Sequence, residues 1–242
     1  MRIVGQLVCG QGEADRYLED TLKEFKRLCD DVVICLAGMG DFSKEEALLR
    51  KYQFRYYFDE REWGKQQPNI KTDLLRRIIQ LNPDWILVLD ADETMPTIDR
   101  EILEELTKNR EACQFYVVNL WNDITHYSKA LSFYNVRFYK HIPGMETQFL
   151  RKPVHCGNAP PYFYSIPAKY SYVPHILLHK GLMKQESRTR KIERYAIYDP
   201  RAIHKGESYY NALSVEASGS EYDEDTVVLT LINELKKHEK TK

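Results

Sequence analysis

The sequence predicts an α/β fold built on an open and mostly parallel sheet, and three observations support this. In the first half, continuously apolar runs alternate with amphipathic helical stretches, which is typical of parallel strands that helices cover on both faces. The 242 residues are enough for one large domain with a substantial core. A composition of 43% hydrophobic and 29% charged residues is that of a globular protein and excludes a disordered chain.

The elements of the first half follow from hydrophobic periodicity. Apolar runs predict strands at residues 3–9, 32–37, 54–58 and 85–89. Apolar residues at helical spacing predict helices over residues 17–28, 43–49 and 72–81. Ser43 and Glu46 have the spacing of a capping box at the start of the second helix. Thr72 or Asp73 is expected to open the third.

The second half is less regular. Strands are predicted at residues 114–121, 136–139 and 176–178, a turn at Pro143-Gly144, and helices at 184–197 and 224–239, with 214–220 as a linker. Aromatic residues make up 12% of the chain, and many of its 17 tyrosines lie in this half. They fit either a half-buried antiparallel sheet or a platform on which sugar rings or bases stack.

Charge, cysteine usage and hydropathy narrow the functional classes. Lys and Arg (35) nearly balance Asp and Glu (36), so no nucleic-acid partner is expected. The five cysteines are odd in number and lack CxxC spacing, which argues against a disulfide framework and a cysteine-bound zinc. No apolar run approaches the roughly 20 residues of a transmembrane helix, and the N-terminus lacks a signal-peptide stretch. We therefore expect a cytoplasmic protein without a transmembrane segment, for which peripheral membrane contact stays open.

The chemistry is expected at the end of the fourth predicted strand, where Asp90-Ala91-Asp92-Glu93 follows the apolar run. Strand alternation would place the side chains of Asp90 and Asp92 on one side. Ligands of open sheets collect at this edge, and two carboxylates there repel each other unless a cation lies between them. Mg²⁺ or Mn²⁺ suits such ligands and can bridge to a diphosphate. The alternative is a solvated acidic turn that caps the next helix.

Several blocks of sequence, in order along residues 1–200, carry a resemblance to a known family. They are Glu13 to Leu22 after the first strand, Pro83 to Glu93 around the acidic motif, Arg137-Phe138-Tyr139, Pro153-Val154-His155, His179-Lys180-Gly181, and Arg188 to Pro200. Together they resemble family-2 glycosyltransferases of the GT-A fold, of bacterial type and with a DxD motif. The block that ends at Glu93 is the most specific, because it is similar to that family's DWILVLDADE signature.

The resemblance implies a single GT-A domain of α/β class. A Rossmann-like nucleotide-binding half with a mostly parallel sheet would be continuous with a mixed α+β acceptor half. We expect residues 1–110 to bind the nucleotide-sugar and residues 111–213 to bind the acceptor, with a linker and C-terminal helix at 214–242. The implied reaction is the metal-dependent, inverting transfer of a sugar from a UDP- or GDP-linked donor to a hydroxyl of a glycan, lipid-linked or peptide acceptor.

The resemblance also implies site residues. The expected contacts of a Mn²⁺ or Mg²⁺ ion, a Lewis acid toward the diphosphate leaving group, are Asp90, Asp92 and His179. The expected nucleotide-sugar contacts are Cys9, Gly10, Glu13, Asp41, Lys71, Asp90, Ala91, Arg188 and Lys191. The candidates for the general base that takes the acceptor proton are Asp123, Glu146 and His155. The base of the nucleotide is expected between residues 9–12 and 36–41, and the basic stretch 180–195 is expected to close over the diphosphate.

Three positions depart from the family pattern. The second strand ends in Leu36-Ala37 where the family has an acidic residue that contacts the nucleotide base. Gly12-Glu13 replaces an Asn-Glu pair, and Cys156 stands where a carboxylate often follows. These departures leave two alternatives open. One is a non-catalytic relative that binds a nucleotide or glycan, and the other is a sugar-phosphate nucleotidyltransferase, whose chemistry also uses carboxylate-held Mg²⁺.

Overall fold

A computed structural model describes residues 1–150, 156–165, 170–200, 212–213, 220–223, 226–227 and 230–231 of the chain. The expected linker at 214–220 and the expected helix at 224–239 lie almost entirely outside these residues. Within them, the strands are β1 (Ile3–Cys9), β2 (Asp31–Ala37), β3 (Arg55–Asp59), β4 (Trp85–Val88), β5 (Glu93–Thr94), β6 (Ala112–Asn119), β7 (His126–Tyr127), β8 (Phe133–Lys140), β9 (Tyr170–His179) and β10 (Ser220–Glu221). The helices are α1 (Leu18–Leu28), α2 (Ser43–Tyr52), α3 (Trp63–Ile79), α4 (Arg100–Leu106), α5 (Tyr162–Ser165) and α6 (Gln185–Tyr198).

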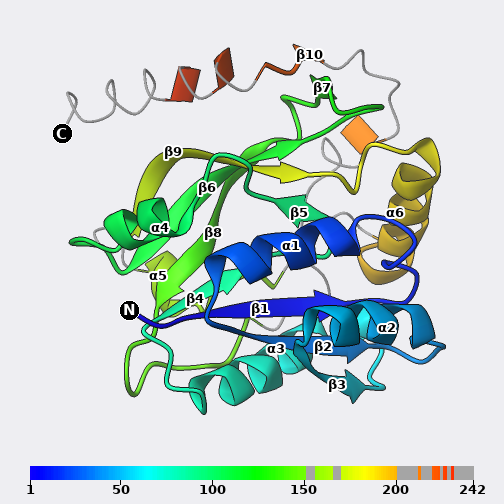
Figure 1. Ribbon diagram of the computed structural model, residues 1–242. Helices are drawn as coiled ribbons and strands as arrows, with labels where there is room; N and C mark the ends of the chain where they lie inside the picture. The colour runs from blue at the N-terminus through cyan, green and yellow to red at the C-terminus, as the bar shows by residue number, and fades with distance from the viewer. Residues whose placement is uncertain are drawn as a thin grey trace.

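Eight of the described strands form one sheet in the order β3-β2-β1-β4-β8-β6-β9-β5 (Figure 1). The first four are parallel to one another. Beyond β4 the sheet is mixed, because β8 is antiparallel to both β4 and β6, whereas β9 is parallel to β6. The predicted α/β class is confirmed, and the two continuous halves are the architecture that the GT-A resemblance implies.

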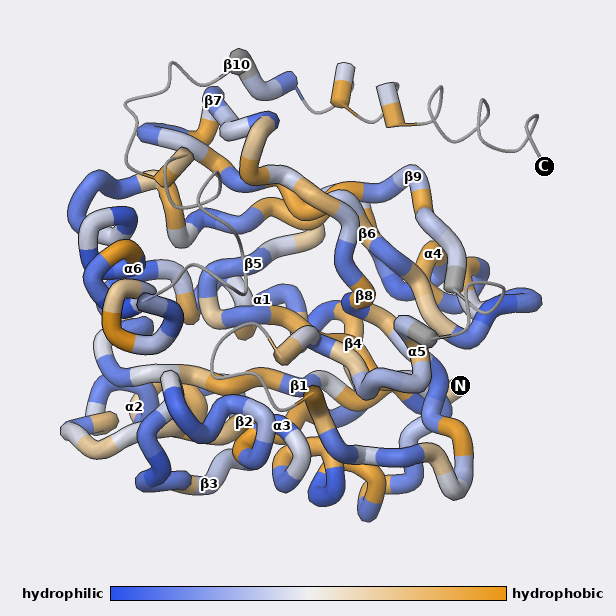
Figure 2. Tube along the Cα trace, turned by 180° about the vertical axis from the view of Figure 1, so that it is seen from behind, coloured by the Kyte–Doolittle hydropathy of each residue, from blue (hydrophilic) through white to orange (hydrophobic). Residues whose placement is uncertain are grey.

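The parallel half has a core on each face of the sheet. Along β1, Ile3 and Leu7 pack on one face with the apolar side of α1, whereas Val4 packs on the other face with α3. Gly5 lets α1 approach closely, since a Cβ there would lie 2.6 Å from the ring of Phe25. Figure 2 shows hydrophobic residues along the central strands and hydrophilic ones in the outer loops. Because both faces are covered, ligands have access mainly at the edge where the parallel strands end.

The mixed half brings distant segments to the acidic motif. Strand β5 begins at Glu93, the last residue of the motif, and pairs antiparallel with the end of β9, so that Glu93 lies opposite His179. Strand β8 pairs with β4, and Arg137 of β8 lies just beyond the Leu87–Phe138 pair. Both pairings deliver polar side chains to the carboxyl edge of the parallel half. In the part of the chain that the structure describes, no helix is long and apolar enough to cross a membrane.

Three sequence expectations are corrected. Helix α3 begins at Trp63 and not at Thr72, and Pro68 lies inside the helix. Ser43 is the first residue of α2 and makes no capping hydrogen bond, since Phe42 occupies the N-cap position. Strand β4 ends at Val88, so the acidic motif forms a turn in which the Glu93 N–H donates to the Asp90 carbonyl at 3.1 Å. Strand alternation therefore does not orient Asp90 and Asp92.

Candidate active site

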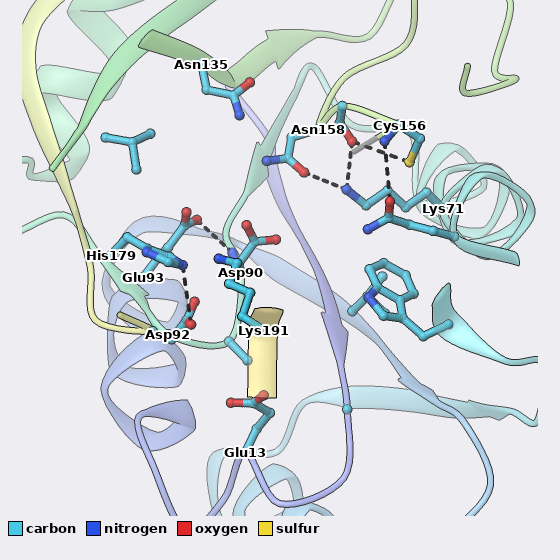
Figure 3. A pocket seen from close by; sticks show the side chains of 18 of the residues that line it. Glu13, Lys71, Asp90, Asp92, Glu93, Asn135, Cys156, Asn158, His179 and Lys191 are labelled. Atoms are coloured by element: carbon cyan, nitrogen blue, oxygen red, sulfur yellow. Dashed lines mark hydrogen bonds and ion pairs between the residues drawn. The ribbon is translucent and has the colours of Figure 1, made fainter. Parts of the chain in front are cut away.

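A cleft of about 680 Å³ opens at the carboxyl edge of the parallel strands. The turn after β1, the acidic motif after β4, the end of β9 and one side of α6 all contribute to its wall. Of the residues predicted from sequence, the cleft is lined by Gly10, Glu13, Lys71, Asp90, Ala91, Asp92, His179 and Lys191. Figure 3 shows the side chains of Glu13, Lys71, Asp90, Asp92, His179 and Lys191 around one space. Segments from both halves of the chain thus meet in a single cleft.

An ion-pair network holds the acidic turn. Glu93 is fully buried and accepts a hydrogen bond from the Asp90 N–H at 2.8 Å. Arg137, which is only 2% exposed, donates to Glu93 and to Asp90 Oδ2, the latter at 3.0 Å. Burial by itself would raise the pKa of Asp90, but the charge of Arg137, with that of Lys71, holds this pKa well below its ordinary value. Asp90 is therefore an anion that faces the cleft at physiological pH.

Glu93 and Arg137 were not among the predicted site residues. Both lie inside the blocks that carry the family resemblance, and this was the available signal. Their pairing depends on the contact between the acidic turn and β8, which residue spacing alone does not encode.

Asp92 and His179 form the candidate metal pair. Asp92 Oδ2 lies 3.5 Å from His179 Nε2, and both side chains are mostly buried, at 17% and 12% exposure. The Glu93–His179 register creates this approach, and the Lys180 N–H donates to the Asp92 carbonyl at 2.9 Å to hold it. Burial lowers the pKa of His179 despite the nearby carboxylate, so its imidazole is neutral at physiological pH. Neutral imidazole is the form that binds metals.

The pair fits one divalent cation. Bonds from a metal to carboxylate oxygen or imidazole nitrogen measure roughly 2.0–2.2 Å, so an ion can contact both atoms across a 3.5 Å gap. The described residues contain no group of three or more His, Cys, Asp or Glu side chains arranged to hold a metal. Two protein donors leave most of the coordination to other ligands. Mg²⁺ is commonly held this way, by one or two carboxylates together with substrate phosphates and water.

Gly181 leaves the space that the pair occupies. A Cβ at this position would lie 2.1 Å from Asp92 Oδ2 and 3.0 Å from His179 Nε2. The backbone of Gly181 is not in the left-handed region, so its conformation does not require glycine. The absence of a side chain here therefore serves the Asp92–His179 approach.

Helix α6 supplies the basic side of the cleft. Arg190, Lys191 and Arg194 line it, and the charge of Lys191 contributes to the lowered pKa of His179. The helix is attached to the parallel half near both ends. Arg16 Nη2 donates to Ser187 Oγ at 2.8 Å, and the Tyr198 hydroxyl donates to Glu62 at the start of α3. These contacts hold Arg190, Lys191 and Arg194 in the same cleft as Asp90 and Asp92.

Arg188, a predicted nucleotide contact, does not line the cleft. Its side chain is 4% exposed. It donates to the carbonyls of Leu182 and Met183 at 2.7 and 3.1 Å, and it stacks on Trp121 at 4.2 Å from the ring centroid. The helical phase of α6 turns Arg188 inward, so it supports the turn that follows His179.

The predicted nucleotide side is only partly assembled in the cleft. Cys9 is fully buried at the end of β1, and Asp41 is exposed outside the cleft, where it accepts from the Ser43 N–H at 2.9 Å. Lys71 lines the cleft but is 5% exposed, and it donates to the Gly157 carbonyl and to Asn158 Oδ1 at 2.7 and 2.6 Å. Lys71 therefore anchors the segment at 156–158.

A buried carboxylate shapes the turn after β1. Glu45 of α2 accepts from the N–H groups of Gly12 and Ala14 at 2.8 and 3.1 Å. The next carboxylate, Glu13, faces the cleft, and burial together with the charge of Asp92 raises its pKa to about 7. Because two of its N–H groups already bond to Glu45 and Glu13 adds a carboxyl group, the turn offers little attraction to a phosphate.

The structure does not gather the three candidates for the general base. Asp123 is exposed and accepts from Thr125 and His126, and neither it nor Glu146, which is also exposed, lines the cleft. His155 lies outside the described residues. In the described cleft, the carboxylates are Glu13, Asp90, Asp92 and Glu93.

No family model matches the chain, and no curated protein matches it in sequence. Solved structures resemble it in the course of the backbone. A putative nucleotide-diphospho-sugar transferase from Desulfovibrio desulfuricans G20 is 11% identical, with 96% of this chain and 99% of that chain covered and a TM-score of 0.42. TarS from S. aureus is 11% identical, with 88% of this chain and 71% of that chain covered and a TM-score of 0.43. A cytidylyltransferase from Leptospira borgpetersenii is 13% identical, with 99% of this chain and 94% of that chain covered and a TM-score of 0.43. Likenesses this remote assign no activity to the chain.

Proposed function

We propose that this protein is a metal-dependent glycosyltransferase that uses a nucleoside diphosphate sugar as its donor. The observation that carries the proposal is the Asp92–His179 pair, with its 3.5 Å gap, at the floor of a cleft that Arg190, Lys191 and Arg194 border. A divalent ion on the pair and cations on the opposite side are the two features that a diphosphate leaving group needs.

The reaction requires the acceptor oxygen to form a bond to the anomeric carbon while the bond from that carbon to the diphosphate oxygen breaks. The nucleoside diphosphate leaves with the electron pair, and the acceptor proton passes to a base. When bound, a metal on Asp92 and His179 would neutralise the charge that develops on the leaving diphosphate. Lys191 and its neighbours on α6 would bind the same group from the other side. His155 stays our candidate for the base.

The turn after β1 favours sugar transfer over nucleotidyl transfer. Glycine-rich loops hold a nucleotide's phosphates with free backbone N–H groups and a lysine. Here the N–H groups of Gly12 and Ala14 already bond to Glu45, and Glu13 adds a carboxyl group beside them. These contacts make the turn a poor site for a triphosphate. They are compatible with a diphosphate held by a metal on Asp92 and His179 and by the cations of α6.

The test compares two Asp–His pairs of this chain. Asp123 Oδ1 lies 2.9 Å from His126 Nδ1 on the surface, outside the cleft, and provides a matched control for Asp92 and His179. We expect Asp92→Asn and His179→Ala each to weaken Mn²⁺-dependent binding of UDP or GDP at least tenfold, as measured by calorimetry. Asp123→Asn and His126→Ala should leave that binding as in the wild type. Equal effects of the two sets would overturn the metal assignment.

Product analysis then separates the reaction classes. We expect the wild-type protein with Mn²⁺ to release UDP or GDP from a nucleotide-sugar. Release of pyrophosphate from a nucleoside triphosphate and a sugar phosphate would indicate a nucleotidyltransferase. Metal-dependent nucleotide binding without turnover, across a panel of acceptors, would indicate the non-catalytic relative that the Leu36 and Cys156 departures suggest.

A further inference from the structure

Part of the cleft lining is uncharged. Phe133, Leu150 and Tyr164 belong to this lining, and each remains partly open to solvent, at 38%, 43% and 38% exposure. Two neutral amides, Asn135 and Asn158, line the same cleft, and both residues hydrogen-bond to Tyr164. We call these five residues the amide–aromatic wall. Large apolar side chains that stay exposed inside a cleft indicate a surface that a ligand covers.

Hydrogen bonds orient the polar groups of this wall. The Tyr164 hydroxyl lies 3.3 Å from the Asn158 N–H, which donates to it, and 3.4 Å from Asn135 Oδ1, to which it donates. Lys71 can only donate, so its 2.6 Å bond fixes Oδ1 of Asn158 on the lysine side and leaves the Nδ2 group as a donor. Figure 3 shows both amide side chains at the rim of the same space as Asp90.

Among the described residues, the cations beside the wall are Arg137 and Lys71, and both bond to other groups of the fold. Arg137 donates to Asp90 and Glu93, and Lys71 donates to Gly157 and Asn158. Asp90 itself is an anion that faces the cleft. Within the described residues, an anionic group bound here would meet the Asp90 carboxylate while Arg137 and Lys71 already bond to other groups, so its desolvation would be costly. The described part of the wall therefore selects for a neutral ligand with both an apolar face and hydroxyl groups.

We propose that the amide–aromatic wall binds a neutral pyranose ring of the acceptor. The apolar face of such a ring can cover Phe133, Leu150 and Tyr164, and its hydroxyl oxygens can accept from the amide Nδ2 groups. The assignment of this ring as the acceptor rests on the proposed function. Of the acceptor classes that the sequence leaves open, the wall selects a glycan over a peptide or a charged sugar.

The experiment measures ligand binding, so that it does not depend on turnover. Saturation-transfer NMR on the full chain, with UDP and Mn²⁺ present, compares methyl pyranosides with sugar phosphates, uronic acids and a serine-containing peptide. We expect the neutral pyranosides to bind and the others to bind at least tenfold more weakly. The Phe133→Ala variant should lose roughly tenfold in pyranoside affinity. Phe58→Ala, which alters a phenylalanine that is 53% exposed outside the cleft, should lose none.

The outcomes distinguish this proposal from the proposed function. Preferential binding of anionic sugars or of the peptide, or equal pyranoside affinity in the Phe133→Ala and wild-type proteins, would overturn the subsite. If the wild-type protein binds pyranosides through Phe133 but shows no Mn²⁺-dependent UDP binding, the subsite stands as a glycan site and the transferase proposal fails. A Tyr164→Phe variant supplies a second test, because it keeps the ring and removes only the hydroxyl that donates to Asn135 Oδ1 and accepts from the Asn158 backbone N–H.

Discussion

Replacing Gly181 with alanine tests how the Asp92–His179 pair is built. The added Cβ would lie 2.1 Å from Asp92 Oδ2, whereas ordinary contact begins at 3.4 Å. One of the two groups must therefore move by about 1.3 Å. Asp92 is the one expected to move, because its carboxylate is the end of a flexible side chain with 17% exposure and can rotate toward solvent.

We expect Gly181→Ala to weaken metal binding and to leave the stability of the fold nearly unchanged. A carboxylate displaced by more than an ångström no longer contacts an ion that His179 holds. Loss of groups that merely orient metal ligands typically weakens metal affinity 10–100-fold, so we expect a weakening of at least that order, about 1.4–2.8 kcal/mol. The free energy of unfolding should change by less than about 1 kcal/mol, since alanine fits the backbone conformation of Gly181 and restricts the unfolded chain.

The assay is the ratio of the UDP dissociation constant measured without Mn²⁺ to the one measured with Mn²⁺. We expect this ratio to fall at least tenfold in Gly181→Ala while UDP binding without metal stays near the wild-type value. Gly10→Ala is the matched control. It alters another glycine that lines the cleft, where a Cβ meets nothing within 4 Å, and it should preserve the ratio. A wild-type ratio in Gly181→Ala, with thermal stability intact, would refute the reasoning.

Three further predictions concern two other groups of the cleft and the buried Arg188. Burial and Asp92 raise the pKa of Glu13 from 4.5 to about 7, so the folded state retains a proton that the unfolded state releases. The unfolding free energy of the metal-free protein should therefore fall as the pH rises from about 4.5 to 7, by at most about 3 kcal/mol, and urea titrations should show a smaller fall in Glu13→Gln. Trp63 lines the cleft, whereas Trp85 and Trp121 are buried. A nucleotide that stacks there should quench tryptophan fluorescence, and Trp63→Phe should abolish the quenching. Arg188→Met should lower the unfolding free energy by roughly 2–4 kcal/mol, because it leaves buried carbonyls unpaired. Unchanged stability with weaker UDP binding would instead restore Arg188 to the nucleotide site.

Local hydropathy determined the elements of the parallel half. The predicted strands at 3–9, 32–37 and 85–89 correspond to β1, β2 and β4, and the predicted helix at 17–28 corresponds to α1. These predictions succeeded because burial on both faces of a sheet, or along one side of a helix, imposes a period that neighbouring residues display. The acidic motif at Asp90 was also recognisable locally, since it follows a strand directly.

Tertiary structure decided how the site is assembled. His179 meets Asp92 only because β5 and β9 pair in one register, and a shift of one residue would turn His179 to the opposite face. Arg188 turned inward because one side of α6 packs on Trp121, and charge composition does not reveal which side packs. The sequence by itself determined the strands, the helices and the position of the acidic turn, because hydrophobic burial acts on neighbouring residues. The partners of each carboxylate depend on contacts between segments far apart in the chain, and only the folded arrangement decided them.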